Sequence, residues 1–121
     1  MRGLLIGLAA AGSLAGCDKP LTVPDAPGVC WRLVESGPNG KPEFRPIAPE
    51  VPSLEDCAVR LDRIRMRNGR PMTGGFQGRY IYASDREVTA ASGPKAQRYR
   101  IFTPEQLAKI REGLQTLIDA R

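Results

Sequence analysis

The sequence predicts a small α+β domain, in which two helices pack against an antiparallel sheet in the chain order ββαβββα. Two amphipathic segments with capping residues predict the helices, and short extended stretches between turn-forming residues predict the strands. The chain has 121 residues, of which 41% are hydrophobic and 26% are charged, and this leaves room for one core. We therefore expect a single domain over residues 29–121.

Two extended stretches at the start of this domain predict a β-hairpin. Residues 29–35 are expected to form the first strand, residues 36–40 the turn, and residues 41–47 the second strand. Pro42 and Pro46 have no backbone N–H to donate to a neighbouring strand. The second strand is therefore expected at an edge of the sheet, or as an irregular arm.

A helix is expected after this hairpin. Ser53 is a suitable N-cap, Asp56 stands at the third position of a capping box, and Asn68-Gly69 forms a left-handed stop. Apolar residues recur at steps of three and four and so predict one buried stripe. This stripe consists of Leu54, Cys57, Ala58, Leu61 and Ile64.

Three further strands are expected in the second half of the domain. Residues 79–83 and 87–91 predict a second hairpin, and residues 97–102 predict a short strand. The glycine-rich segment 74–78 is expected to lead into the hairpin, where its glycines permit a bulge or close packing.

The last element is expected to be a helix that begins at a well-marked cap. Thr103 provides the N-cap, Pro104 the first helical position and Gln106 the capping-box partner. An apolar stripe continues to the C-terminus, whereas Arg111 is placed outside it. The stripe consists of Leu107, Ile110, Leu114, Leu117 and Ile118.

The N-terminal segment has the features of an export signal. A short basic start precedes an apolar stretch from Leu4 to Ala15. As a helix this stretch rises only about 18 Å, whereas the hydrocarbon core of a bilayer is about 30 Å thick. It is therefore too short for a permanent membrane span.

The end of this segment, Leu14-Ala15-Gly16-Cys17, resembles the lipobox of bacterial lipoproteins. The resemblance implies that residues 1–16 are removed as a signal peptide and that Cys17 carries diacylglycerol and a further acyl chain. Several such chains anchor a protein stably to a membrane. The alternative is an ordinary secretory signal with an incidental cysteine. Asp18 slightly favours the inner over the outer membrane, and the choice stays open.

Residues 18–28 contain three prolines and no amphipathic period, and they are expected to form a flexible tether behind the lipidated Cys17. If they are extended at about 3.1 Å per residue, they place the domain up to about 34 Å from the lipid surface.

With Cys17 assigned to lipid by this resemblance, Cys30 and Cys57 remain. Exported proteins reach an oxidising compartment, so we expect these two cysteines to form a disulfide. The alternative is two separate reactive thiols. Strand alternation places Cys30 and Arg32 on one face and Trp31 on the other. Either the second helix covers the face of Trp31, or Cys30 stands at an irregular start of the strand.

The composition argues against an enzyme, because the chain contains no histidine and therefore lacks the commonest general base and zinc ligand. Ser92-Gly93-Pro94-Lys95 fits the spacing of a serine acyl-transfer motif, but Gly-Pro breaks the helical turn that this motif needs. The acidic residues lack the spacing of a calcium loop. We expect no catalytic residue, metal or cofactor. The acidic residues that could supply a cation site or an acid pair are Glu55, Asp56, Asp62, Asp85 and Glu87.

Five arginines between residues 60 and 70 predict the most plausible contact surface. They suit anionic lipid, a cell-wall polymer or an envelope protein, whereas a solvated helix flank is the simpler interpretation. Nucleic acid is not an expected partner of an exported chain. These residues are Arg60, Arg63, Arg65, Arg67 and Arg70.

The sequence thus predicts a lipid-anchored module of the bacterial envelope that faces the periplasm and acts by binding or as a structural element. The alternative is a small carboxylate-dependent enzyme, which would need two acids that converge in a cleft.

Overall fold

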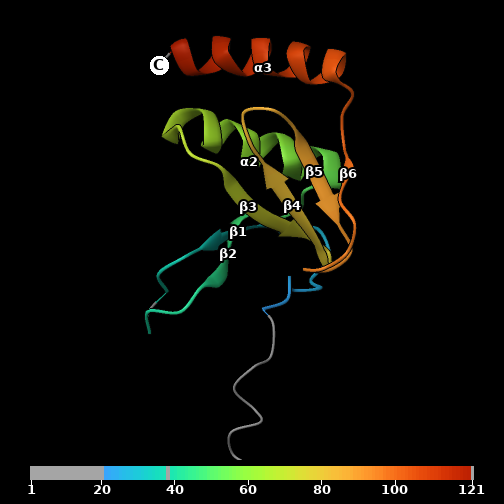
Figure 1. Ribbon diagram of the computed structural model, residues 1–121. Coiled ribbons are helices and arrows are strands. Elements are labelled where there is room, and N and C mark those ends of the chain that lie inside the picture. Colours follow the sequence, from blue (N-terminus) through green and yellow to red (C-terminus); the bar gives the residue numbers. More distant parts are fainter. Residues whose placement is uncertain (1–20, 38, 121) are drawn as a thin grey trace, which may run out of the picture.

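The computed structural model of the protein describes residues 21–37 and 39–120 (Figure 1). It contains two helices and a six-stranded antiparallel sheet, so the expected α+β class is confirmed. The predicted signal peptide 1–16 and the lipid site Cys17 lie outside the described residues. The helices are α2 (Leu54–Asn68) and α3 (Pro104–Asp119), and the strands are β1 (Cys30–Val34), β2 (Glu43–Ala48), β3 (Met72–Phe76), β4 (Arg79–Ala83), β5 (Val88–Ala91) and β6 (Tyr99–Arg100).

The sheet has the strand order β2-β1-β3-β4-β5-β6, and the chain order is ββαββββα. The prediction missed β3, which was expected only as a lead-in to β4. Two adjacent glycines lower the strand propensity of β3, but the segment pairs with β1 on one side and β4 on the other. Gln77 and Gly78 close the β3–β4 hairpin with positive φ angles of 46° and 84°.

The outer strands agree with the sequence in part. β2 pairs only with β1 and therefore lies at an edge, as expected for a strand that contains Pro46. The expected strand over residues 97–102 is limited to Tyr99 and Arg100, which pair with β5 at the other edge. The predicted hairpins β1–β2 and β4–β5 are both present.

Both helices begin at the expected caps. The Ser53 side chain accepts a hydrogen bond from the backbone N–H of Asp56, and Gly69 ends α2 in the left-handed conformation. At α3, Thr103 and Gln106 form a complete capping box. The helix boundaries therefore follow from local sequence.

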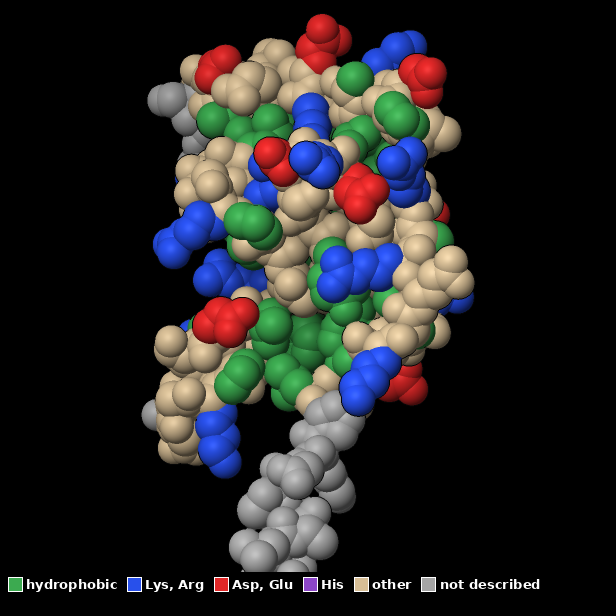
Figure 2. Space-filling view, in the orientation of Figure 1, with side chains coloured by type: hydrophobic (Ala, Val, Ile, Leu, Met, Phe, Trp, Pro, Cys, Tyr) green, Lys and Arg blue, Asp and Glu red, His purple; other side chains and the backbone are tan. Residues whose placement is uncertain are grey.

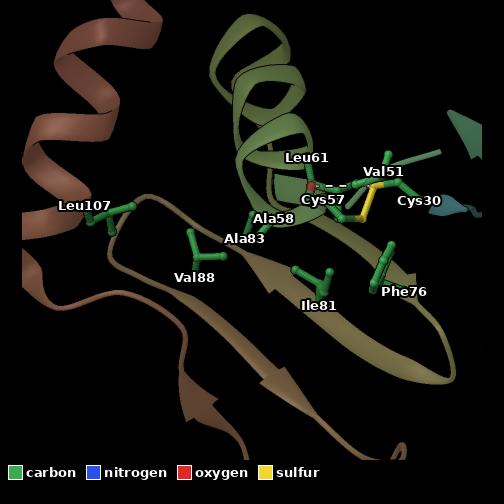
Figure 3. Close-up of a cluster of buried hydrophobic side chains, with 10 residues drawn as sticks. All are labelled: Cys30, Val51, Cys57, Ala58, Leu61, Phe76, Ile81, Ala83, Val88 and Leu107. Atoms are coloured by element: carbon green, nitrogen blue, oxygen red, sulfur yellow. Dashed lines mark hydrogen bonds between the residues drawn. A yellow bond between two sulfur atoms is a disulfide. The ribbon is translucent and has the colours of Figure 1, made fainter. Parts of the chain in front are cut away.

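The core lies between α2 and one face of the sheet (Figure 3). Leu61 of α2 and Ile81 of β4 are both completely buried, and Leu107 brings α3 to the margin of the same cluster. α2 packs on this face, and α3 packs against α2 and, through Arg111, against the β4–β5 turn (Figure 1). Leu117 departs from the expected stripe of α3, since it is 52% exposed.

The predicted disulfide joins Cys30 of β1 to Cys57 of α2, with 5.3 Å between the Cα atoms. Both residues are fully buried, so the bond fixes the helix to the sheet inside the core. In the chain-entropy model, closing a loop of this size stabilises a fold by about 3.6 kcal/mol.

The uncertainty about the two faces of β1 is resolved by its neighbours. Cys30 faces α2, and the pairing of β1 with β2 is irregular between Cys30 and Trp31. The pairing with β3 is regular, so Trp31 points to the face without helices. Neither helix covers that face.

Candidate functional site

Three of the five predicted arginines line one shallow groove between α2 and β2. Arg60, Arg63 and Arg67 follow each other along the flank of the helix, and Ile47 and Ala48 form part of an apolar floor. The groove has a volume of about 250 Å³. It therefore offers up to three guanidinium groups to one small anionic group, and we call it the arginine groove.

The three side chains differ in their existing partners. Arg60 donates to the Asp56 carboxylate over 3.0 Å, but both side chains are largely exposed, so this ion pair contributes little. The Nε atom of Arg63 is buried and has no hydrogen-bond partner among the described residues. Arg67 is exposed. An anionic ligand would give Arg63 and Arg67 charge-assisted hydrogen bonds.

The other two predicted contact residues lie elsewhere, which corrects the expectation of one five-arginine surface. Arg65 is only 11% exposed and donates to the buried carboxylate of Asp62 over 2.7 Å. Arg70 lies beyond the end of α2, in a separate hollow beside Arg32. A helix places residues 60, 63 and 67 on one flank, whereas residue 65 faces another direction.

Asp62 is the centre of an ionic cluster that was missed by sequence reasoning. It is 1% exposed and binds Arg65, while both of its oxygens accept hydrogen bonds from Arg111 of α3. Arg111 also donates to the backbone carbonyl of Asp85 over 2.7 Å. The cluster therefore ties α2, α3 and the β4–β5 turn together. Arg111 was wrongly expected outside the packed side of α3, because its partner is distant in sequence.

The remaining acidic residues do not converge. Glu87 binds Arg100 on the neighbouring strand, while Glu55 and Asp85 are exposed. In residues 21–37 and 39–120, no group of three His, Cys, Asp or Glu side chains is arranged to hold a metal ion. Asp62 is occupied by arginines, so it is not a cation ligand as considered above.

The face of the sheet without helices carries apolar and aromatic side chains, which we call the aromatic face: Trp31, Leu33, Phe44, Tyr80 and Tyr82. The Phe44 and Tyr80 rings meet edge-on at 6.0 Å, and those of Tyr80 and Tyr82 stack at 6.2 Å. In the space-filling view, hydrophobic side chains gather in the lower half of the molecule, away from α3 (Figure 2).

A cationic side chain lies over this aromatic face. The guanidinium carbon of Arg98 stands 3.6 Å from the centroid of the Tyr82 ring. Such cation–π contact holds an exposed arginine close to the sheet. The aromatic face therefore combines ring surfaces with positive charge at its margin.

Residues 21–28 lie on the sheet, in contrast to the expectation of a flexible tether over all of 18–28. Val23 is 6% exposed and packs against Gly75 of β3, because glycine leaves space where a Cβ atom would collide with it. The Tyr80 hydroxyl donates to the Leu21 carbonyl, and Gly78 N–H donates to the Pro24 carbonyl over 3.2 Å. The segment therefore forms part of the domain, and we call residues 21–28 the N-terminal segment.

Among the titratable groups of the described residues, Tyr80 has the most clearly shifted pKa. Burial raises the pKa of the Tyr80 phenol, and the neighbouring Tyr82 raises it further. The neutral phenol is the hydrogen-bond donor to Leu21, so the shift favours the form that holds the N-terminal segment.

Comparisons with protein-family models, curated proteins and solved structures find no match for this chain. Across the part of the chain that the structure describes, neither helix is long and apolar enough to cross a membrane. The fold and the groove thus define an α+β domain with one internal disulfide and a cationic surface groove.

Proposed function

We propose that the protein is a lipoprotein of the bacterial cell envelope that is anchored through Cys17, faces the periplasm and binds an anionic group in the arginine groove. The anchor is supported by the lipobox-like run Leu14–Cys17 at the end of a short apolar segment. The binding role is supported by the arginine groove itself. In this proposal the domain acts by contact and not by catalysis.

The observation that carries the binding role is the arrangement of three arginines around an apolar floor. Of these three arginines, Arg60 alone has an ion-pair partner among the described residues, and that pair is exposed. Guanidinium groups bind phosphate and carboxylate through paired hydrogen bonds. Ile47 and Ile64 leave apolar surface beside the charges, which suits an anionic group on a larger partner.

The test of the groove compares two variants with equal loss of charge. In the first, Arg60, Arg63 and Arg67 are replaced by Gln. In the control, exposed Arg86, Lys95 and Lys109, which lie outside the arginine groove, are replaced by Gln. Binding of the chain from Asp18 onward is measured on phosphatidylglycerol vesicles and on purified cell-wall fragments at rising salt concentration.

A basic residue near an anionic surface contributes about 1 kcal/mol, so loss of the three groove arginines should weaken binding roughly 100-fold. The control variant should keep most of the affinity, and salt should weaken the unmodified chain. Equal losses in the two variants would mean that net charge alone acts. Absence of binding to both probes would contradict the binding role.

The anchor is tested separately by intact-mass analysis of the protein extracted from membranes. The expected result is a chain that begins at Cys17 and carries acyl chains. An unmodified chain that begins at another residue contradicts the anchor and leaves the test of the groove unaffected.

A further inference from the structure

We propose that the aromatic face of the sheet lies against the membrane that carries the lipid anchor. This inference rests on the proposed acylation of Cys17. It adds an orientation to that proposal: the sheet is the membrane-facing layer, and the helices face the periplasm.

The chain between the lipid and the domain has a short reach. Only residues 18–20 separate Cys17 from Leu21, whose carbonyl is held by the Tyr80 hydroxyl. A fully extended chain covers at most about 3.6 Å per residue, so Cys17 lies within about 14 Å of Leu21. This is less than half of the 34 Å that a free tether over residues 18–28 would allow, because residues 21–28 lie along the sheet.

The N-terminal segment leaves the domain from the aromatic face. Val23 packs against Gly75 from the side opposite α2, and Tyr80 belongs to the aromatic face. An α-helix with its side chains is about 10–12 Å across, and α3 lies beyond α2 (Figure 1). A link of about 14 Å therefore brings the aromatic face to the bilayer more readily than the outer surface of α3.

The side chains of the aromatic face suit the surface of a membrane. Aromatic side chains favour the interface between water and hydrocarbon, where a tyrosine ring is buried and its hydroxyl stays hydrated. The Nε1 atom of Trp31 is buried without a hydrogen-bond partner among the described residues, so Trp31 contributes apolar ring surface and no hydrated group. Trp31, Phe44 and Tyr82 are partly exposed, and Leu21 beside them is 41% exposed. Arg98 and Arg100 lie at the margin, where phosphate groups of lipids would meet them. An uncovered sheet face of this composition indicates a contact surface.

The orientation also separates the two surfaces of the domain. The arginine groove is formed by α2 and the helix-facing side of β2, and therefore lies in a different layer from the aromatic face. A domain that rests on its aromatic face presents the groove away from the bilayer surface. The anionic group in the groove would then belong to a cell-wall polymer and not to the bilayer.

The chain itself contains the probe for this inference, because Trp31 is its only tryptophan. The acylated full-length protein is reconstituted in vesicles of phosphatidylethanolamine and phosphatidylglycerol, and Trp31 fluorescence is measured with lipids brominated at several acyl positions. The expected result is quenching by bromine near the headgroups and reduced quenching by aqueous acrylamide, relative to the same protein in solution without vesicles.

A matched control moves the tryptophan to the opposite side. Trp31→Phe combined with Leu117→Trp places the only tryptophan on α3, at a site that is 52% exposed. This variant should show no quenching by brominated lipids and unchanged access to acrylamide. Equal lipid quenching at the two sites would contradict the proposed orientation.

Other occupants of the aromatic face give different results. Acylated protein whose Trp31 remains open to acrylamide and insensitive to bromine overturns the inference while the anchor stands. Protection from acrylamide without bromine quenching, together with a dimeric mass in detergent, would show that a second copy covers the face. If the full-length protein is isolated without acyl chains, both the anchor and this inference are contradicted.

Discussion

The two faces of the sheet differ in what covers them, and two adjacent glycines in β3 display the difference. Gly74 faces α2, where a Cβ atom would lie 2.5 Å from the Leu61 side chain. Gly75 faces the other way and accommodates Val23 of the N-terminal segment. The helix face is closed by a disulfide, a core and an ionic cluster, whereas the aromatic face is covered in part by one short segment.

The two faces therefore contribute differently to the domain: one supplies the buried core, and the other retains partly exposed rings. The helix face contains the fully buried side chains Leu61, Ile81 and Val88, so most of the hydrophobic stabilisation arises there. The aromatic face retains half-buried rings. We therefore expect changes on the helix face to alter the stability of the whole domain, and changes on the aromatic face to alter chiefly the position of the N-terminal segment.

The largest expected effect is the loss of the disulfide. Replacement of both Cys30 and Cys57 by Ala should lower the free energy of unfolding by about 3–4 kcal/mol, because the unfolded chain regains the freedom of the closed loop. Urea denaturation of the variant and of the unmodified chain measures this. A change below about 1 kcal/mol would contradict the role assigned to the bond.

The second effect concerns close packing on the helix face. Gly74→Ala should cost about 3 kcal/mol, because the new methyl group meets both the Leu61 side chain and the Trp31 carbonyl oxygen. The midpoint of urea denaturation reports it. Gly113→Ala on α3 is the control, since open space surrounds that position, and it should leave stability unchanged or raise it by up to about 1 kcal/mol.

The third effect tests the aromatic face by the same substitution one residue further along. Gly75→Ala should displace Val23 and cost about 1–2 kcal/mol, since the burial of one valine is lost but the core remains closed. Limited proteolysis should then cut within residues 21–28 while the rest of the domain resists. Equal damage by Gly74→Ala and Gly75→Ala would remove the distinction between the faces.

The smallest effect is a dependence on alkaline pH. The folded-state pKa of Tyr80 lies above the unfolded value of about 10, so the folded state holds this proton more tightly. The resulting stabilisation is fully present below about pH 10 and is lost as pH rises through the folded-state pKa. Denaturation between pH 8 and 11 should show this loss in the unmodified chain and a smaller one in Tyr80→Phe. Identical curves would contradict the role of the phenol.

The sequence was sufficient to predict those features of the structure that depend on residues close together in the chain. The ends of α2 and α3 follow from Ser53, Gly69 and Thr103, whose capping bonds lie within a few positions. The disulfide also followed, although its assignment depended on the export signal. Propensity failed at β3, where Gly74 and Gly75 are selected by the side chains that pack against them and not by strand preference.

The candidate site was predicted less completely, because its contacts are long-range. Residues 60, 63 and 67 could be placed on one helix flank, but nothing local indicated the groove wall from β2. The pairing of Asp62 with Arg111 spans 49 positions. A signal for it existed in α2, since Asp62 lies next to Leu61 of the apolar stripe, where an acidic residue requires a partner.

The prediction of a flexible tether over residues 18–28 also failed because the contacts are long-range. Three prolines between residues 18 and 28 indicate extended chain, but only the fold reveals that Val23 meets Gly75 and that Leu21 meets Tyr80. The contacts depend on two strands that lie more than fifty residues further along the chain. The length of free chain between Cys17 and the folded domain therefore could not be estimated from composition alone.

The most direct test of the difference between the faces is a nuclear Overhauser measurement on Val23. We expect strong effects between the Val23 methyl protons and the α protons of Gly75, together with slow exchange of the Gly78 amide proton, which donates to the Pro24 carbonyl. Methyl signals of Val23 at random-coil positions, without any effect to Gly75, would show that the N-terminal segment is free of the sheet and would contradict the account.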